Sequence, residues 1–137
     1  MGIIQESLGK QQDALLFYKK SLKLKFNYYG ENNEEVLELQ YKISCVLMSL
    51  KKYKEAEEIM NAMTEVVFRE KLADCENDNM YRYGVYFYTA GIIFIKNNKM
   101  KVAKQHLKKA KNLWKYILYL NDPCLISLEN FLKLVDN

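Results

Sequence analysis

Few residues of this sequence belong to the types that catalyse reactions or bind metal ions. The only histidine is His106, which excludes any site built on two or more histidines. We expect it on the exposed side of its helix, and no carboxylate or nucleophile lies near it in the sequence, so a catalytic role is not expected. The three cysteines, Cys45, Cys75 and Cys124, are widely spaced and form no CxxC pair, which argues against a zinc site or a disulfide framework. With no glycine-rich phosphate loop and no HExxH motif either, we expect no enzyme, no metal and no cofactor. The cysteine usage predicts an intracellular, cytoplasmic protein.

Lysine supplies the most prominent charge pattern. The net charge is +4, and the segment 96–115 holds eight lysines and no acidic residue. Five of these lysines recur at spacings of three and four, and we call them the lysine ridge: Lys101, Lys104, Lys108, Lys111 and Lys115. Such a ridge could bind a polyanion, meaning RNA, an anionic lipid or an acidic protein. It is also typical of the solvated face of an amphipathic helix, and this is the favoured interpretation because that face has no aromatic residues interleaved with the lysines at base-stacking positions. Nucleic acid and membrane are therefore not the expected partners.

An internal repeat organises the chain that carries these residues. Three segments align, namely 9–14, 51–56 and 98–103, and they end at Ala14, Ala56 and Ala103. A small residue stands 12 positions before each alanine: Gly2, Ser44 and Gly91. Small residues at matching positions allow two helices to approach closely, so each unit is predicted to be a pair of packed helices.

Apolar periodicity and helix-capping residues define the helices. Apolar residues recur at helical spacing, and no strand pattern competes with them. One proline and five glycines are too few breakers for a small β-sandwich, and the nearly apolar run 83–95 is too short to cross a bilayer. Capping is predicted from Asn32 with Glu35, from Asp78, and from Asp122 followed by Pro123. The predicted helices are 1–8, 11–29, 33–49, 52–72, 78–97, 99–120 and 122–135, and Trp114 is predicted to lie in the core.

The repeated motifs resemble those of tetratricopeptide (TPR) repeats. The resemblance rests on Leu8-Gly9-Lys10 with Ala14, Tyr18 and Ser21, on Tyr53 with Glu55-Ala56, and on Ala90-Gly91 with Phe94, Ala103, Leu107 and Ala110. The units are longer than the usual ~34 residues, and the segment 29–36 is similar to the link of kinesin-light-chain-type repeats. Lys51 and Asn98 replace the usual turn glycine, and we expect both to sit in an ordinary turn.

This resemblance implies an all-α fold, an α-α superhelix of the TPR-like right-handed solenoid type. We expect about three helical hairpins plus a C-terminal capping helix in a single domain, residues 1–137. The repeats are expected at approximately 1–32, 33–77 and 78–121 and the capping helix at 122–135. Because Met1 already falls inside the first repeat, the chain is expected to be a fragment of a larger protein.

The resemblance also implies a function. First helices of TPR units line a concave groove that binds a partner peptide or protein, without catalysis. Helical phase gives the candidate groove residues: Glu38, Tyr41, Lys42, Cys45 and Ser49, then Val85, Tyr88, Thr89, Ile92 and Lys96, with Ser127, Asn130 and Phe131 from the last helix. Some of them, Cys45 and Ile92 above all, are equally well explained as core.

The type of partner can be narrowed by the charges of the candidate groove. TPR clamps for an Hsp90-type C-terminal tail use a ring of cationic and amide side chains. Here the matching positions hold Ile3, Lys42, Val85 and Thr89, so only one is cationic and that partner is not expected. Kinesin-light-chain repeats bind peptides with acidic flanks. Lys42 and Lys96 could pair with such flanks, whereas the negative charge of Glu38 opposes their binding. Pairing of two copies through exposed repeat ends stays open.

Overall fold

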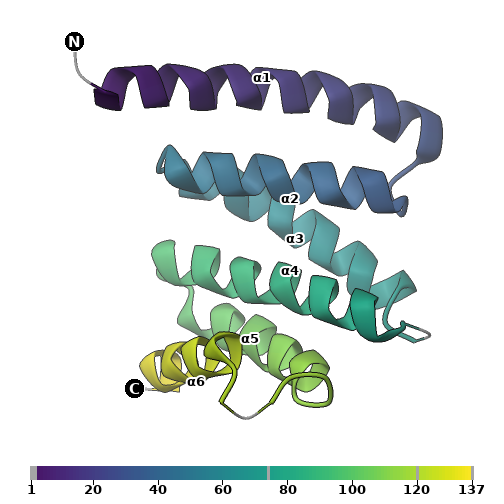
Figure 1. Ribbon diagram of the computed structural model, residues 1–137, viewed down its shortest axis with the longest axis vertical. Coiled ribbons are helices and arrows are strands. Elements are labelled where there is room, and N and C mark those ends of the chain that lie inside the picture. The colour runs from purple at the N-terminus through teal and green to yellow at the C-terminus, as the bar shows by residue number, and fades with distance from the viewer. Residues whose placement is uncertain (1–2, 74, 120, 137) are drawn as a thin grey trace. The chain divides into compact units, whose positions relative to one another are not determined.

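The protein is all-α. The computed structural model describes residues 3–73, 75–119 and 121–136, with the backbone alone for 3–8, 77 and 78. This part of the chain forms six helices and no strand (Figure 1). The helices are α1 (Ile3–Tyr29), α2 (Glu34–Ser49), α3 (Tyr53–Glu70), α4 (Asn77–Lys96), α5 (Met100–Trp114) and α6 (Pro123–Asp136).

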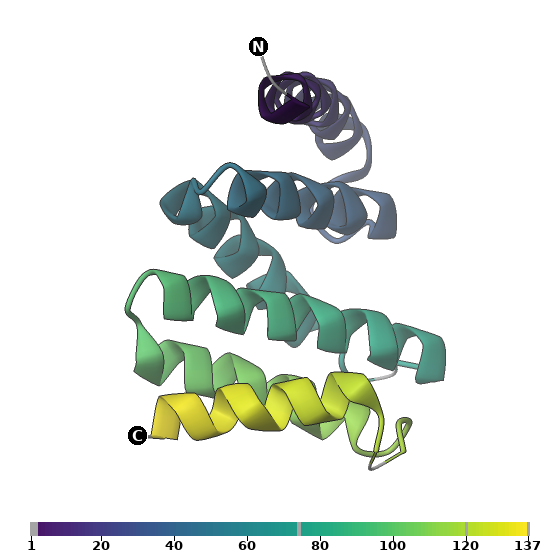
Figure 2. The same ribbon diagram turned by 60° about the vertical axis from the view of Figure 1, so that its left-hand side comes forward.

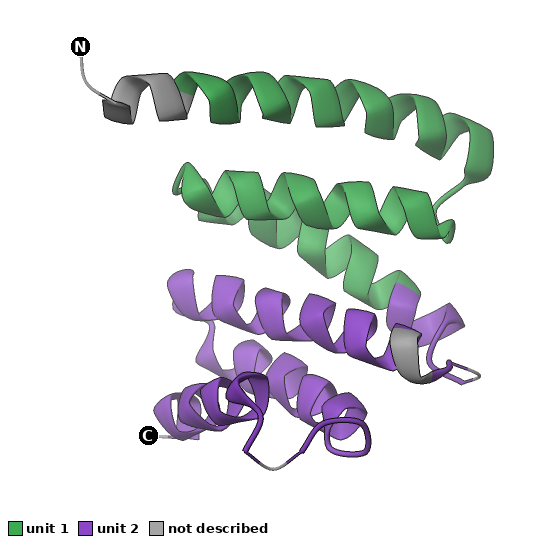
Figure 3. Cartoon of the chain, viewed as in Figure 1, with its two compact units in different colours: residues 1–66 green, residues 67–137 purple. Residues whose placement is uncertain are grey.

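The chain divides into two compact units, which are described separately. The first is Met1–Val66 and the second is Val67–Asn137, so the division falls inside α3 (Figure 3). In the first unit α1 packs against α2. In the second unit α4 and α5 form a closely packed hairpin and α6 packs along α5, which both views show (Figures 1 and 2). The predicted single domain and its repeat boundaries stay a prediction.

The first helix is longer than predicted. We expected a break between residues 8 and 11, and this is wrong, because α1 runs through Gly9 without interruption for 27 residues. A glycine inside a helix costs only about 1 kcal/mol, whereas a break leaves orphan backbone groups at two new helix ends. Gly9 therefore lowers the stability of α1 without ending it. Gly2, one of the small residues of the repeat, lies outside the described residues.

Side-chain capping explains where α2 and α6 begin, whereas the N-cap residue of α4 makes no side-chain capping hydrogen bond. Asn33, one residue after the predicted position, caps α2, and its side chain accepts the Glu35 N–H at 2.9 Å. Asp78 does not precede α4 as predicted, because α4 begins at Asn77 with Glu76 as its N-cap residue. The predicted cap of α6 is confirmed, since Asp122 accepts the Cys124 N–H at 2.9 Å and Pro123 is the first helical residue.

The turns that close α2 and α4 have the same hydrogen-bond pattern. After α2, the Lys51 N–H donates to Met48 and the Lys52 N–H to Leu47, at 2.9 and 2.8 Å. After α4, Asn98 and Lys99 donate to Ile95 and Phe94 in the same way, at 3.0 and 2.8 Å. This is the Schellman arrangement, which places one residue in the left-handed region. The φ angle is 62° at both Lys51 and Asn98, so the expected ordinary turn is wrong.

Small residues let α4 and α5 approach closely. A Cβ atom at Gly91 would lie 2.7 Å from the Leu107 side chain, and one at Gly84 would overlap the indole of Trp114. The Trp114 ring is 1% exposed, and its Nε1–H donates to the Tyr81 carbonyl at 3.1 Å. The prediction that Trp114 belongs to the core is confirmed. Ser44, the repeat equivalent of Gly91, is buried in α2 and donates its hydroxyl to Gln40.

Candidate partner-binding surfaces

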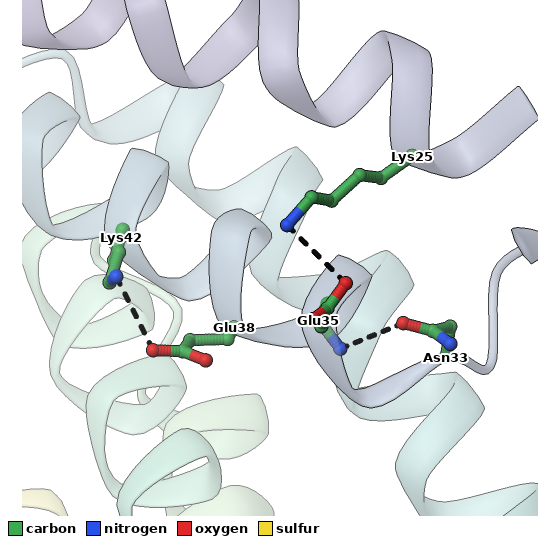
Figure 4. Close-up of polar contacts among 5 residues, drawn as sticks. All are labelled: Lys25, Asn33, Glu35, Glu38 and Lys42. Atoms are coloured by element: carbon green, nitrogen blue, oxygen red, sulfur yellow. Dashed lines mark hydrogen bonds and ion pairs between the residues drawn. The ribbon is translucent and has the colours of Figure 1, made fainter. Parts of the chain in front are cut away.

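The candidate surface of the first unit lies on α2. Glu38 and Lys42 are exposed, one helical turn apart, and their side chains form an ion pair at 3.3 Å (Figure 4). The Lys42 Nζ also lies 5.9 Å from the centre of the Tyr18 ring on α1. Tyr18 was not among the residues predicted for this surface. An exposed pair of this kind contributes under about 1 kcal/mol, so Lys42 can exchange Glu38 for a partner's carboxylate at low cost.

Tyr41 and Cys45 form a polar pair on the same surface. Both side chains are half-buried, and a hydrogen bond links them. Burial raises the pKa of the Cys45 thiol above its ordinary value, although the hydrogen bond from Tyr41 acts in the opposite direction. A protonated thiol is a poor nucleophile, so Cys45 is suited to packing and contact rather than to chemistry. Ser49, one turn further on, is exposed.

The candidate surface of the second unit lies on α4 and is less open than expected. Val85 and Ile92 are half-buried and Lys96 is exposed. Thr89 is only 8% exposed, because it lies on the α4 face that also buries Tyr86 and Ile93. The structure therefore leaves Thr89 little surface to offer a partner.

Helix α6 covers part of Tyr88. The Tyr88 ring lies 5.5 Å from the Trp114 ring and 5.8 Å from the Phe131 ring, measured between centroids. Its hydroxyl bonds to Ser127, and burial raises the pKa of Tyr88 above its ordinary value. Ser127 and Phe131 thus contact Tyr88 within the chain, while Asn130 is exposed. Tyr88 remains half-buried, so a portion of it stays accessible.

Two members of the lysine ridge are paired with acids of α6. Lys104 forms an ion pair with Asp136, and Lys111 forms one with Glu129 at 2.6 Å. The hydrogen bond from Lys104 lowers the pKa of the Asp136 carboxyl below its ordinary value. The remaining ridge members, Lys101, Lys108 and Lys115, are exposed. These pairs weaken the polyanion alternative, which stays a prediction.

The sequence contains a signal for these pairs that the periodicity of α5 alone does not reveal. Lys104 and Lys111 are seven residues apart, as are Glu129 and Asp136. Two antiparallel helices bring such sets together, the first lysine with the last acid. The lysine ridge was predicted from α5 alone to be exposed, and two of its lysines instead pair with acids of α6.

His106 is buried, so the expected exposed position is wrong. Its ring packs against Phe94, with 4.8 Å between centroids, and Nδ1–H donates to the Val102 carbonyl at 3.0 Å. Burial lowers the pKa of His106, and the nearby Lys109 ammonium lowers it further. Our prediction failed because aromatic rings of α4 accept a neutral imidazole into an apolar interface. Within the described residues, no group of three His, Cys, Asp or Glu side chains could hold a metal ion.

Comparisons with known proteins identify the fold. The tetratricopeptide repeat family matches residues 37–66. The crystal structure of nearly identical TPR-like repeats from a kinesin light chain candidate of Podosopora anserina superposes with a TM-score of 0.80 at 12% identity, covering 93% of this chain and 57% of that one. The crystal structure of BtubC (BKLC) from P. vanneervenii superposes with a TM-score of 0.73 at 19% identity, covering 93% of this chain and 49% of that one. No curated protein matches the chain.

These similarities confirm the predicted resemblance and the predicted fold class. The chain contains a tetratricopeptide repeat and has the fold of kinesin-light-chain-like TPR proteins. It spans only about half the length of the two solved chains. Within its described residues, no helix combines the length and apolar character needed to cross a membrane.

Proposed function

Because the chain has a TPR fold, and TPR repeats commonly serve as protein-interaction modules, we propose that it is a non-enzymatic scaffold for a protein or peptide partner. The partner binds the surfaces of the first helices, α2 and α4. The observation that carries this proposal is the pair Tyr41 and Tyr88. They stand 47 residues apart at equivalent repeat positions, and both are half-buried with a hydrogen-bonded hydroxyl.

A half-buried tyrosine suits partner binding for physical reasons. Its ring offers apolar area at little cost in side-chain entropy, and its hydroxyl directs hydrogen bonds. Neighbours already restrain both rings, Cys45 in one case and Ser127 in the other, so less ordering is needed on binding. The accompanying charges, Lys42 on α2 and Lys96 on α4, favour a partner that carries carboxylates.

The chemistry of the remaining side chains agrees with a scaffold. Cys45, Cys75 and Cys124 are free thiols, and burial raises the pKa of Cys45 and Cys75. Neither thiol is thereby activated as a nucleophile. Free thiols fit the reducing cytoplasm, where we place the scaffold.

Affinity capture with matched variants tests this function. The tagged chain is incubated with native cell extract, and retained proteins are quantified by mass spectrometry against an untagged control. Tyr41→Ala and Lys42→Ala test α2, and Tyr88→Phe tests the α4 hydroxyl while keeping its ring against Trp114. Tyr119→Ala is the control, since Tyr119 is 85% exposed and lies outside α2 and α4.

The proposal expects at least one specific partner whose retention falls with the α2 and α4 variants and persists with Tyr119→Ala. Circular dichroism must show the same helix content in every variant. A partner retained equally by all four variants would contradict the assignment of these surfaces. If retention disappears with Tyr119→Ala as well, the capture reflects nonspecific adsorption rather than binding at α2 and α4.

A further inference from the structure

A hollow between α5 and α6 forms a second candidate binding surface, apart from the first helices. Its volume is about 250 Å³, and it lies wholly within the second unit. We call it the α5–α6 hollow, and its lining residues are Lys111, Lys115, Leu125, Ile126, Glu129, Asn130 and Lys133. It shares Asn130 with the candidate groove residues and Lys111 and Lys115 with the lysine ridge.

The size and floor of the hollow define what can enter it. Pockets for drug-sized ligands and cofactors usually measure ~300–1,000 Å³, so this hollow suits a single bulky side chain. Two aliphatic residues contribute its apolar part, Leu125, which is almost fully buried, and Ile126, which is 48% exposed. An exposed aliphatic floor in a concavity gains stability when an apolar side chain covers it.

The rim of the hollow sets the charge of its occupant. Three lysines line it against one acid, Glu129, which is already paired with Lys111 at 2.6 Å. Lys115 and Lys133 are exposed residues at this rim, and the Lys115 Nζ lies 5.0 Å from the centre of the Tyr116 ring, a contact that leaves its charge available to an occupant. An apolar floor beneath two such cations is complementary to an apolar side chain flanked by carboxylates.

The first unit of a second copy does not supply that pattern. The exposed apolar residues of the first unit, such as Phe17 and Leu24, lie on α1. They are accompanied there by lysines, among them Lys20 and Lys23. Bringing this basic helix to the α5–α6 hollow would oppose like charges, which is destabilising.

We propose that the α5–α6 hollow binds an acidic amphipathic segment of a partner protein. One bulky apolar side chain of that segment sits on Leu125 and Ile126, and its carboxylates pair with Lys115 and Lys133. This proposal goes beyond the surfaces of α2 and α4 and does not depend on them.

Three synthetic peptides of equal length test the proposal with fluorescence anisotropy. The first is an amphipathic helical peptide with leucine on one face and glutamate on the other. The second replaces every glutamate by lysine, and the third contains glutamate without leucine. We expect binding of the first alone, and amide shifts in the ¹⁵N-labelled chain concentrated at Ile126, Asn130 and Lys133.

Variants of the chain locate the site. Lys115→Glu, Lys133→Glu and Ile126→Ser should each weaken binding of the acidic amphipathic peptide about fivefold, the order expected when one exposed ion pair or one partly exposed apolar contact is lost. Lys101→Glu is the matched control, because it makes the same charge change on α5 outside the hollow, and it should leave the affinity nearly unchanged. Circular dichroism checks that each variant is folded.

Other results overturn the proposal. Equal weakening by Lys101→Glu and Lys115→Glu would mean diffuse attraction to the lysine ridge. Equal binding of the glutamate-only peptide would show that the apolar floor does not contribute to the affinity. Equal binding of the lysine peptide would show that the lysine charges do not contribute to it. No binding of the acidic amphipathic peptide at millimolar concentration would exclude the site, and a dimer in sedimentation that blocks the peptide would assign the hollow to a second copy.

Discussion

Replacing Lys51 by glycine should stabilise the protein, although glycine usually weakens a helical structure. Lys51 occupies the left-handed position of the turn after α2, with φ at 62°. Its N–H donates to Met48 at 2.9 Å, and this bond belongs to the backbone, so the substitution keeps it. The change therefore acts on the conformational energy of one residue and on the unfolded chain.

The size of the effect follows from two opposing terms. A residue with a Cβ atom loses roughly 1–2 kcal/mol in the left-handed region, which glycine recovers. Glycine loses more backbone entropy on folding, about 0.5–1 kcal/mol. The difference gives a gain of about 0.5–1 kcal/mol for Lys51→Gly. Asn98 occupies the equivalent position, but asparagine tolerates this conformation, so Asn98→Gly should change the stability by less than about 0.5 kcal/mol.

Urea unfolding followed by circular dichroism measures these differences. Lys20→Gly is the matched control, since it makes the same replacement in the middle of α1 on an exposed residue. It should lose about 1 kcal/mol. If Lys51→Gly proves as destabilising as Lys20→Gly, the left-handed turn does not exist in solution, and the repeat equivalence of residues 51 and 98 fails with it.

Three further predictions test the helices and their packing. Gly84→Ala should destabilise by about 2 kcal/mol or more and change the fluorescence of Trp114, whereas Gly91→Ala, which meets the flexible Leu107, should cost less; equal losses would contradict the packing. Burial lowers the pKa of His106 in the folded chain, so the unfolded chain binds a proton at a higher pH than the folded chain does. The stability contributed by the neutral His106 is therefore full above pH ~6.5 and is lost as the pH falls below that value. His106→Phe should therefore flatten the stability profile between about pH 7.5 and 5.5 in chemical unfolding, and an unchanged profile would refute the buried neutral imidazole. Gly9→Ala should raise the stability by about 0.5–1 kcal/mol, because Gly9 is helical and has open space for a Cβ, and a loss would indicate a turn at that position.

The repeat could be read from the sequence because it depends on local spacing. Ala56 and Ala103 recur with the small residues Ser44 and Gly91, and all four are buried in the structure. The helical hairpins follow from these spacings. What the spacing alone does not contain is the choice between a turn and a continuous helix at Gly9, where a small propensity term competes with backbone hydrogen bonds.

The burial of particular side chains was harder to predict, since it depends on which helix packs on which. His106 looks polar in the sequence, yet α4 provides the aromatic ring of Phe94 against it. Tyr88 lies on α4, but its contact with Phe131 comes from a helix far along the chain. Long-range contacts of this kind have no local pattern, so the periodicity of α4 does not distinguish a covered tyrosine from an open one.

Helix α6 determines which positive charges of the second unit remain available. Its acids Glu129 and Asp136 pair with Lys111 and Lys104 of α5. Its own lysine, Lys133, joins Lys115 at the α5–α6 hollow. The same helix therefore neutralises part of the lysine ridge and adds a cation beside an apolar floor. A ridge open along its full length would attract any polyanion, whereas a few cations around one concavity select a partner that also carries an apolar side chain.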